Sequence, residues 1–116
     1  MSRYSTVLVE GNSMEPTYSA GDWLMAQWGK FAVKSQKFSL GDLFGPRVTV
    51  GDVVVIERPE QPGIFYVKRI TQVVESTGQI FVSSDNPEGT DSRQWGLLSV
   101  VAVRAKIISR IRKKRR

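Results

Sequence analysis

The sequence predicts a mostly β fold built as a single domain. Short runs of β-branched and aromatic residues recur along the chain, glycine-containing turn dipeptides separate them, and no amphipathic helix of convincing length lies between them. The length of 116 residues and the hydrophobic content of 41% are enough for one core. We therefore expect one compact β domain.

Six runs are expected to form strands in chain order, because β-branched and aromatic side chains fit a pleated, half-buried surface. They are "TVLVE" (6–10), "WLMAQW" (23–28), "VVVIER" (53–58), "IFYVKRITQVV" (64–74), "IFVS" (80–83) and "LLSVVAVRAKIIS" (97–109). Gly21-Asp22, Gly51-Asp52, Pro62-Gly63 and Thr77-Gly78 read as turns between them. Residues 29–46 show little pattern and are expected to form a long connection, of a kind that is often functional or mobile.

The amino-acid composition excludes several classes of site. The chain contains no cysteine and no histidine, which removes disulfides, cysteine nucleophiles, Ser-His-Asp triads and nearly every zinc or copper site. We expect no metal and no cofactor. If the protein is an enzyme that needs a base, lysine, aspartate, glutamate or tyrosine must supply it.

The positive charge is concentrated at the C-terminus. Residues 110–116 hold six of the 17 basic residues, which leaves 11 basic against 11 acidic residues in the rest of the chain. We therefore divide the chain into a domain over 1–109 and a basic C-terminal tail over 110–116. A neutral body argues against a specific nucleic-acid partner, whereas the tail offers contact with an anionic membrane surface.

No stretch approaches the roughly 20 apolar residues that a membrane span needs. The N-terminal "MSRYST" has no apolar core of a signal peptide. The expected location is the cytoplasm, peripheral at the membrane where the tail makes contact.

The stretch "VEGNSMEPTYSAGDW" (9–23) contains a candidate nucleophile, Ser13. Gly11 permits a tight backbone before the serine, and Pro16 ends regular pairing just after it. Ser13 should therefore lie at an exposed bend between strands. With no histidine in the chain, a neutral lysine is a suitable activating base.

Lys68 is the candidate base. Strand alternation in "IFYVKRI" places Ile64, Tyr66, Lys68 and Ile70 on one face, so the amine projects from an apolar row. Burial among apolar groups lowers a lysine pKa far enough to leave a neutral amine. The alternative reading is a lysine that extends to solvent from an edge strand.

The stretch "SSDNPEGTDSRQWG" (83–96) has the composition of a turn followed by a polar loop. Asp91 and Arg93 are placed to form an ion pair that fixes this loop beneath a site. An ordinary surface loop is the alternative, but the stretch supplies a third part that a serine-lysine hydrolase needs.

Taken in order, these stretches resemble the motif boxes of the type I signal peptidase family of serine-lysine proteases. The matching segments are "GNSMEPT" with "GDWLMAQ", then "GDVVVIERP", "YVKRI" and "SDNPEGTDSRQWG", over residues 7–103. The resemblance implies a single domain of coiled antiparallel sheets with a shallow groove, in which an extended peptide adds as a strand. It implies Ser13 as nucleophile, Lys68 as general base and cleavage after small residues at P3 and P1.

The sequence departs from the family pattern at two supporting positions. Gly11 stands where bacterial members often have a serine that donates to the oxyanion, so the Ser13 backbone N–H and the Asn12 side chain are expected to serve. Gly89 stands where a serine usually orients the lysine, and Thr90 next to it is the candidate hydroxyl. The residues expected to support the site are Gly11, Asn12, Met14, Thr90, Asp91 and Arg93.

The expected function is that of a serine endopeptidase that removes an N-terminal leader or signal peptide from a precursor protein. Only twelve residues precede Ser13, so the chain looks most like the soluble proteases that mature nickel-type superoxide dismutase. Two alternatives stay open: an autoprotease of the SOS-repressor type, and a catalytically inactive β-domain that binds extended peptides. Twelve residues leave no room for the cleavable linker of the former.

Overall fold

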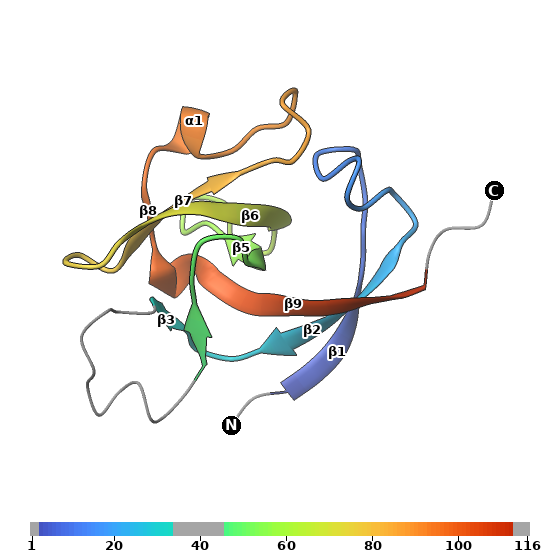
Figure 1. Cartoon of the computed structure of the whole chain (residues 1–116), viewed down its shortest axis with the longest axis horizontal. Helices are drawn as coiled ribbons and strands as arrows, with labels where there is room; N and C mark the ends of the chain where they lie inside the picture. The colour runs from blue at the N-terminus through green and yellow to red at the C-terminus, as the bar shows by residue number, and fades with distance from the viewer. Residues whose placement is uncertain (1–2, 34–45, 113–116) are drawn as a thin grey trace.

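The structure is a computed structural model that describes residues 3–33 and 46–112. Nine strands, one α-helix and one 3-10 helix lie in these ranges (Figure 1). The elements are β1 (Arg3–Leu8), β2 (Trp23–Trp28), β3 (Ala32–Val33), β4 (Arg47–Val48), β5 (Val53–Glu57), β6 (Phe65–Val74), β7 (Gln79–Ser83), α1 (Ser92–Trp95), β8 (Leu98–Ser99), η2 (Val100–Ala102) and β9 (Val103–Arg112). The predicted mostly β fold is confirmed.

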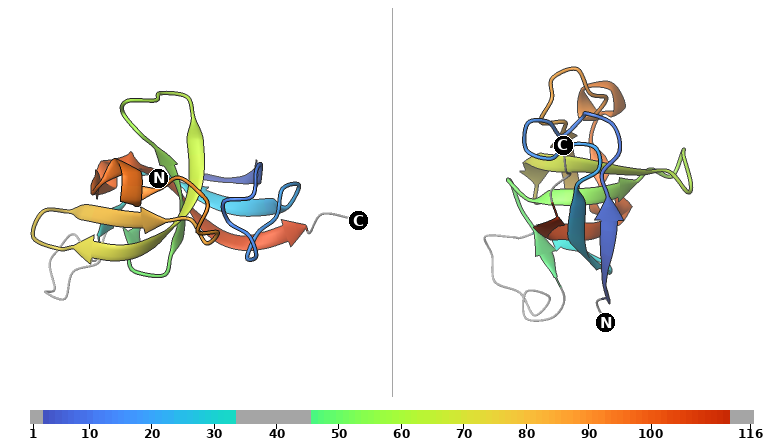
Figure 2. Two further views of the ribbon diagram at one scale, coloured as in Figure 1. Left: turned by 90° about the horizontal axis from the view of Figure 1, so that it is seen from above. Right: turned by 90° about the vertical axis from the view of Figure 1, so that its right-hand side faces the viewer.

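One seven-stranded sheet forms the body, in the order β1-β2-β9-β5-β6-β7-β8. Its paired neighbours are antiparallel, and the sheet curls so that its two halves face different ways (Figure 1). The β6–β7 hairpin and the C-terminal half of β9 project toward opposite ends of the molecule (Figure 2). β9 therefore joins the two halves, because it pairs with β2 on one side and with β5 on the other.

Two groups of buried side chains stabilise the two halves of the sheet. The first includes Val54, Ile56, Ile70, Ile80, Val82 and Val103, mainly from β5, β6 and β7. The second includes Val9, Met14, Leu24, Ala26, Val55 and Ala105, mainly from β2, β5 and β9. Alternate residues of β5 enter different groups, so this strand separates two cores.

The strand bounds differ most from the prediction in the first run and in the last run. The first strand begins at Arg3 and ends at Leu8, because these residues pair with β2 from Trp28 back to Trp23. The apolar run 97–109 is not one strand: η2 interrupts it, and the Ser99 side chain caps this turn by accepting a hydrogen bond from the Val101 N–H. Of the predicted connection 29–46, Ala32–Val33 forms a parallel pair with β4, and residues 34–45 lie outside the described residues.

The final strand extends beyond the predicted start of the basic tail. β9 pairs with β2 through Arg112, and Arg110 forms an ion pair with the buried Asp22 at 3.7 Å. Arg110 also donates a hydrogen bond to the Thr17 backbone oxygen at 3.2 Å. The first basic residues after 109 thus belong to the sheet, and residues 113–116 lie outside the described residues. Within the described ranges, neither helix is long or apolar enough to cross a membrane.

Candidate active site

Ser13 lies in the loop that joins β1 to β2. A backbone hydrogen bond of 2.9 Å from the Val9 N–H to the Asp22 oxygen closes the base of this loop. Gly11 has a φ of 74°, in the left-handed region that glycine adopts without strain. Met14 is buried in the second core, so the loop is anchored just after the serine. Ser13 itself is half-buried at the molecular surface.

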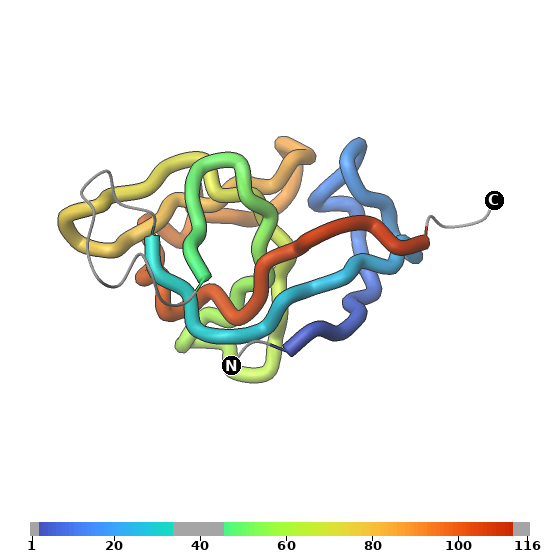
Figure 3. Tube along the Cα trace, turned by 60° about the horizontal axis from the view of Figure 1, so that its bottom comes forward, coloured from blue at the N-terminus to red at the C-terminus, as the bar shows by residue number. Residues whose placement is uncertain are grey.

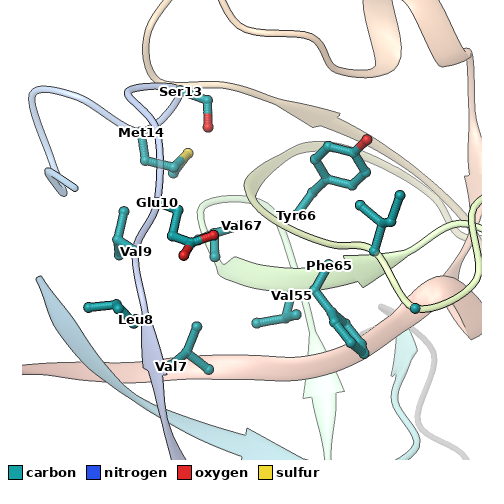
Figure 4. A pocket seen from close by; sticks show the side chains of 12 residues that line it. Val7, Leu8, Val9, Glu10, Ser13, Met14, Val55, Phe65, Tyr66 and Val67 are labelled. Carbon is teal, nitrogen blue, oxygen red and sulfur yellow. The ribbon is translucent and has the colours of Figure 1, made fainter. Parts of the chain in front are cut away.

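A groove of about 430 Å³ runs along β1 as far as Ser13. β1 and the loop after it form one wall, the start of β6 forms the other, and Val55 of β5 lies between them (Figure 4). Val7 and Leu8 on the first wall and Phe65 on the second are apolar. The Ser13 side chain lies at the end of a largely apolar, open groove.

Lys68 is buried in the middle of β6, with only 2% of its surface exposed. It lies opposite Val54 of β5, and its strand neighbours Tyr66 and Ile70 pack in the first core. The predicted apolar row is therefore present at three of its four positions. Ile64 precedes β6 and is exposed. The alternative of a lysine that extends to solvent is not what the structure shows.

Burial of the Lys68 amine favours its neutral form. Burial lowers the pKa of Lys68, the Asp91 carboxylate raises it and the Arg93 guanidinium lowers it again, so that the pKa lies below its ordinary value. The Tyr66 and Trp95 rings lie 5.6 and 5.9 Å from Nζ, measured to the ring centroids. The amine also donates a hydrogen bond of 2.9 Å to the Ser84 hydroxyl oxygen.

Asp91 holds the segment that contains Ser84. Its fully buried carboxylate accepts hydrogen bonds from the Ser84 N–H at 2.7 Å and from the Arg93 N–H at 2.9 Å. Arg93 Nε completes the predicted ion pair at 3.0 Å, and Asp91 caps α1 in a capping box with Gln94. Burial alone raises the pKa of Asp91, but the hydrogen bonds from Arg93 and Ser84 outweigh it and leave the pKa below its usual range.

Gly89 brings the two halves of the site together. A Cβ atom added to it would overlap the Ser84 hydroxyl, would lie 2.6 Å from Ser84 Cβ and would lie 3.1 Å from Ser13 Cβ. The Ser13 and Ser84 side chains therefore flank the same point. Because Ser84 contacts Lys68, the loop after β1 and the strand β6 meet at one place.

Further bonds hold the serine loop against the loop after β7. The Asn86 N–H donates to the Ser13 backbone oxygen at 2.8 Å. The Asn86 side-chain amide donates to the Asn12 backbone oxygen at 3.0 Å. Thr17 donates from its hydroxyl to Asp85. The two loops lie side by side in Figures 1 and 3. The position of Ser13 relative to Lys68 is thus fixed by contacts between segments far apart in the chain.

The predicted supporting residues have different positions. Gly11 and Asn12 are exposed beside Ser13, and Met14 is part of the core beneath it. Asp91 and Arg93 form the predicted pair. The hydroxyl that contacts Lys68 is that of Ser84, not that of the exposed Thr90, which accepts a 3.4 Å hydrogen bond from Ser84 through its backbone oxygen.

Sequence reasoning missed Ser84, although a signal for it exists. Ile80, Val82 and Ser84 alternate along and just beyond β7, and all three are buried. Ser84 is the polar member of this inward row, just as Lys68 is the polar member of the row on β6. Extending the alternation by one residue beyond the predicted strand would have identified it.

The other lysines differ from Lys68 in their surroundings. Lys30 is exposed, and Lys106 on β9 is half-buried in an ion pair of 3.4 Å with Asp52. The remaining four, Lys34, Lys37, Lys113 and Lys114, lie outside the described residues. Lys68 is the buried lysine of the part of the chain that the structure describes.

Comparison with known proteins identifies one related family. A family model described as signal peptidase, peptidase S26, matches residues 1–74. The matched range includes Ser13 and Lys68 and ends before the segment that holds Ser84 and Asp91. A comparison with curated proteins gives no match.

Proposed function

The chain belongs to the signal peptidase family, peptidase S26, and is a signal-peptidase-type serine peptidase; from this premise we propose that Ser13 is its nucleophile and Lys68 its general base. One observation carries the proposal: a buried lysine with a lowered pKa contacts Ser84, and Ser84 and Ser13 flank the same point at Gly89. A serine hydroxyl beside a neutral amine is the arrangement that activates such a nucleophile.

The reaction follows from these two groups. The neutral Lys68 amine accepts the hydroxyl proton of Ser13 while Oγ attacks the carbonyl carbon of the scissile peptide bond. The resulting ammonium returns the proton to the departing amine, which leaves an acyl ester on Ser13. Lys68 then accepts a proton from a water that attacks this ester. The ammonium returns that proton to Ser13 Oγ as the acyl bond breaks, which releases the carboxylic product and restores both residues.

The oxyanion of each tetrahedral intermediate needs hydrogen-bond donors close to Ser13. We assign this role to the Ser13 backbone N–H and to the exposed Asn12 side chain, with Gly11 allowing the backbone to turn between strand and serine. Backbone donors preorganised in this way are among the largest contributors to acyl-transfer catalysis.

The groove favours an extended peptide as substrate. Among the described residues β1 pairs only with β2, and β6 pairs with β7 only from Arg69 onward. The groove walls therefore present a free edge of β1 and a free edge of residues 65–67, between which a peptide strand can add. We propose a precursor with an N-terminal leader that carries small residues at P1 and P3. A nickel superoxide dismutase precursor is the specific candidate.

The pH dependence of cleavage tests the proposed base. The pKa of Lys68 is lowered, so the active neutral amine forms as pH rises through a value below the roughly 10.4 of an unperturbed lysine. The substrates are a panel of extended peptides with alanine at P1 and P3, and the dismutase precursor. Mass spectrometry measures the rate at which new N-termini appear. This rate should rise with pH through the lowered pKa of Lys68. Binding without new termini would instead support the inactive peptide-binding alternative. Rates that follow an unperturbed lysine would remove Lys68 from the mechanism.

A further inference from the structure

Ser84 is held in one orientation by three contacts. Its backbone N–H donates to the Asp91 carboxylate at 2.7 Å, and its hydroxyl donates to the Thr90 oxygen at 3.4 Å. The same hydroxyl oxygen accepts the 2.9 Å hydrogen bond from Lys68 Nζ. Because its proton is directed at Thr90, the Ser84 oxygen presents a lone pair to the amine.

We propose that Ser84 is the positioning residue for Lys68, and that positions 84 and 89 compete for one space in which a single hydroxyl acts. This inference rests on the proposed Ser13–Lys68 pair. Ser84 touches no substrate atom in this proposal and acts only through the lysine.

The chemistry of a neutral amine explains why one fixed acceptor matters. Such an amine has two N–H groups and one lone pair, and only the lone pair accepts the Ser13 proton. An N–H directed at Ser84 Oγ fixes the rotation of the amine, and in the proposal this holds the lone pair in the one direction that accepts the Ser13 proton. Without Ser84 the amine rotates among orientations, most of which are unproductive.

The glycine at position 89 is explained by the same space. Its φ is not in the left-handed region, so its backbone does not require glycine. What excludes a side chain is Ser84, because a Cβ at position 89 would overlap the Ser84 hydroxyl and lie 2.6 Å from its Cβ. A side chain at 89 thus points at the place that the Ser84 hydroxyl occupies. Moving the serine from 84 to 89 should therefore keep a hydroxyl beside Lys68.

The first test is Ser84→Ala in the full chain, with peptide turnover measured as a function of pH. We expect kcat to fall about 100-fold, the cost of a misplaced catalytic group, with KM changed less than about twofold because substrate contacts remain. The rise of rate with pH should move to lower pH. The reason is that the substitution removes the hydrogen-bond acceptor that favours the charged amine. The other groups that face the amine, Asp91, Arg93 and Tyr66, stay in place.

A merely structural role for Ser84 predicts the opposite shift. If the substitution loosened the packing, water would reach Lys68 and its pKa would move up toward the ordinary value. Ser83→Ala is the matched control, because the neighbouring serine is half-buried and bonds to Thr71 at 3.0 Å instead. Its kcat and pH profile should equal those of the wild type. An unshifted or upward-shifted profile for Ser84→Ala overturns the proposal.

The second test exchanges the two residues. Ser84→Gly alone should lose as much activity as Ser84→Ala, and Gly89→Ser alone should also lose activity, because its side chain displaces Ser84 and crowds Ser13. The double variant Ser84→Gly/Gly89→Ser should recover at least about tenfold in kcat over Ser84→Gly, since non-additivity of this kind marks residues that share one space. No recovery in a folded double variant contradicts the shared space.

Ser13→Ala, assayed together with these variants, distinguishes a failure of the proposed function from a failure of the proposed role of Ser84. If Ser13→Ala still cleaves, the proposed function itself fails. If Ser13→Ala is inactive while Ser84→Ala keeps wild-type kcat and pH profile, the nucleophile stands and only the role of Ser84 is overturned.

Discussion

Ser13→Ala and Lys68→Met are each expected to lower peptide turnover by at least about a thousandfold, because the proposed nucleophile and the proposed base act as one unit. The fold should remain intact in both variants. Ser13 is only half-buried, and methionine fills most of the space of the buried lysine while removing an amine that is costly to bury. The measurement is turnover of an alanine-containing peptide together with the free energy of unfolding in denaturant.

Lys106→Met is the matched control for the lysine. Lys106 is half-buried on β9, and its ion pair with Asp52 at 3.4 Å lies outside the groove. Turnover should change by less than about twofold, as expected for a pair that contributes only modestly to stability. Substantial turnover by a folded Lys68→Met variant would rule out Lys68 as the base.

Asp91→Ala is expected to lower the free energy of unfolding by about 2–4 kcal/mol. The substitution removes the cap of α1, worth about 1 kcal/mol, and leaves the buried Ser84 N–H without its acceptor, worth about 1–3 kcal/mol. It also releases Arg93 from its 3.0 Å contact. Chemical denaturation of the purified variant measures the loss directly.

Asp52→Ala provides the comparison for this variant. Asp52 also accepts a backbone N–H bond, of 2.9 Å from Thr49, but that bond is exposed. We expect a loss of less than about 1 kcal/mol. Equal losses for the two aspartates would mean that the buried network around Asp91 is not what stabilises the loop after β7.

Local rules decide the positions of the two residues proposed as nucleophile and base, so both could be singled out from the sequence. Strand alternation places Lys68 in an apolar row, and the burial of Ile70 and the partial burial of Tyr66 around it follow from the same period. Gly11 before Ser13 and Pro16 after it predict a bend, and the positive φ of Gly11 agrees with that reading. Short-range pattern was sufficient to predict the bend at Ser13 and the burial of Lys68.

Other features depend on contacts that a linear pattern does not contain. The acceptor for Lys68 comes from Ser84 because Asp91 and Gly89 shape the loop around it. Arg110, the first arginine of the predicted basic tail, belongs to β9. Its guanidinium forms an ion pair with Asp22 and donates a hydrogen bond to the Thr17 backbone oxygen. The run 97–109 is interrupted at η2, although it contains no glycine or proline from which a turn could be predicted.

The most direct test of the central claim is detection of an acyl ester on Ser13. The full chain is mixed with an alanine-containing peptide ester, quenched in acid within the first turnover, digested and analysed by mass spectrometry. The acyl mass should appear on the fragment that contains Ser13, and neither Ser13→Ala nor Lys68→Met should form it. An acyl group on a different residue, or peptide cleavage by the wild type through a route that Ser13→Ala retains, would contradict the account.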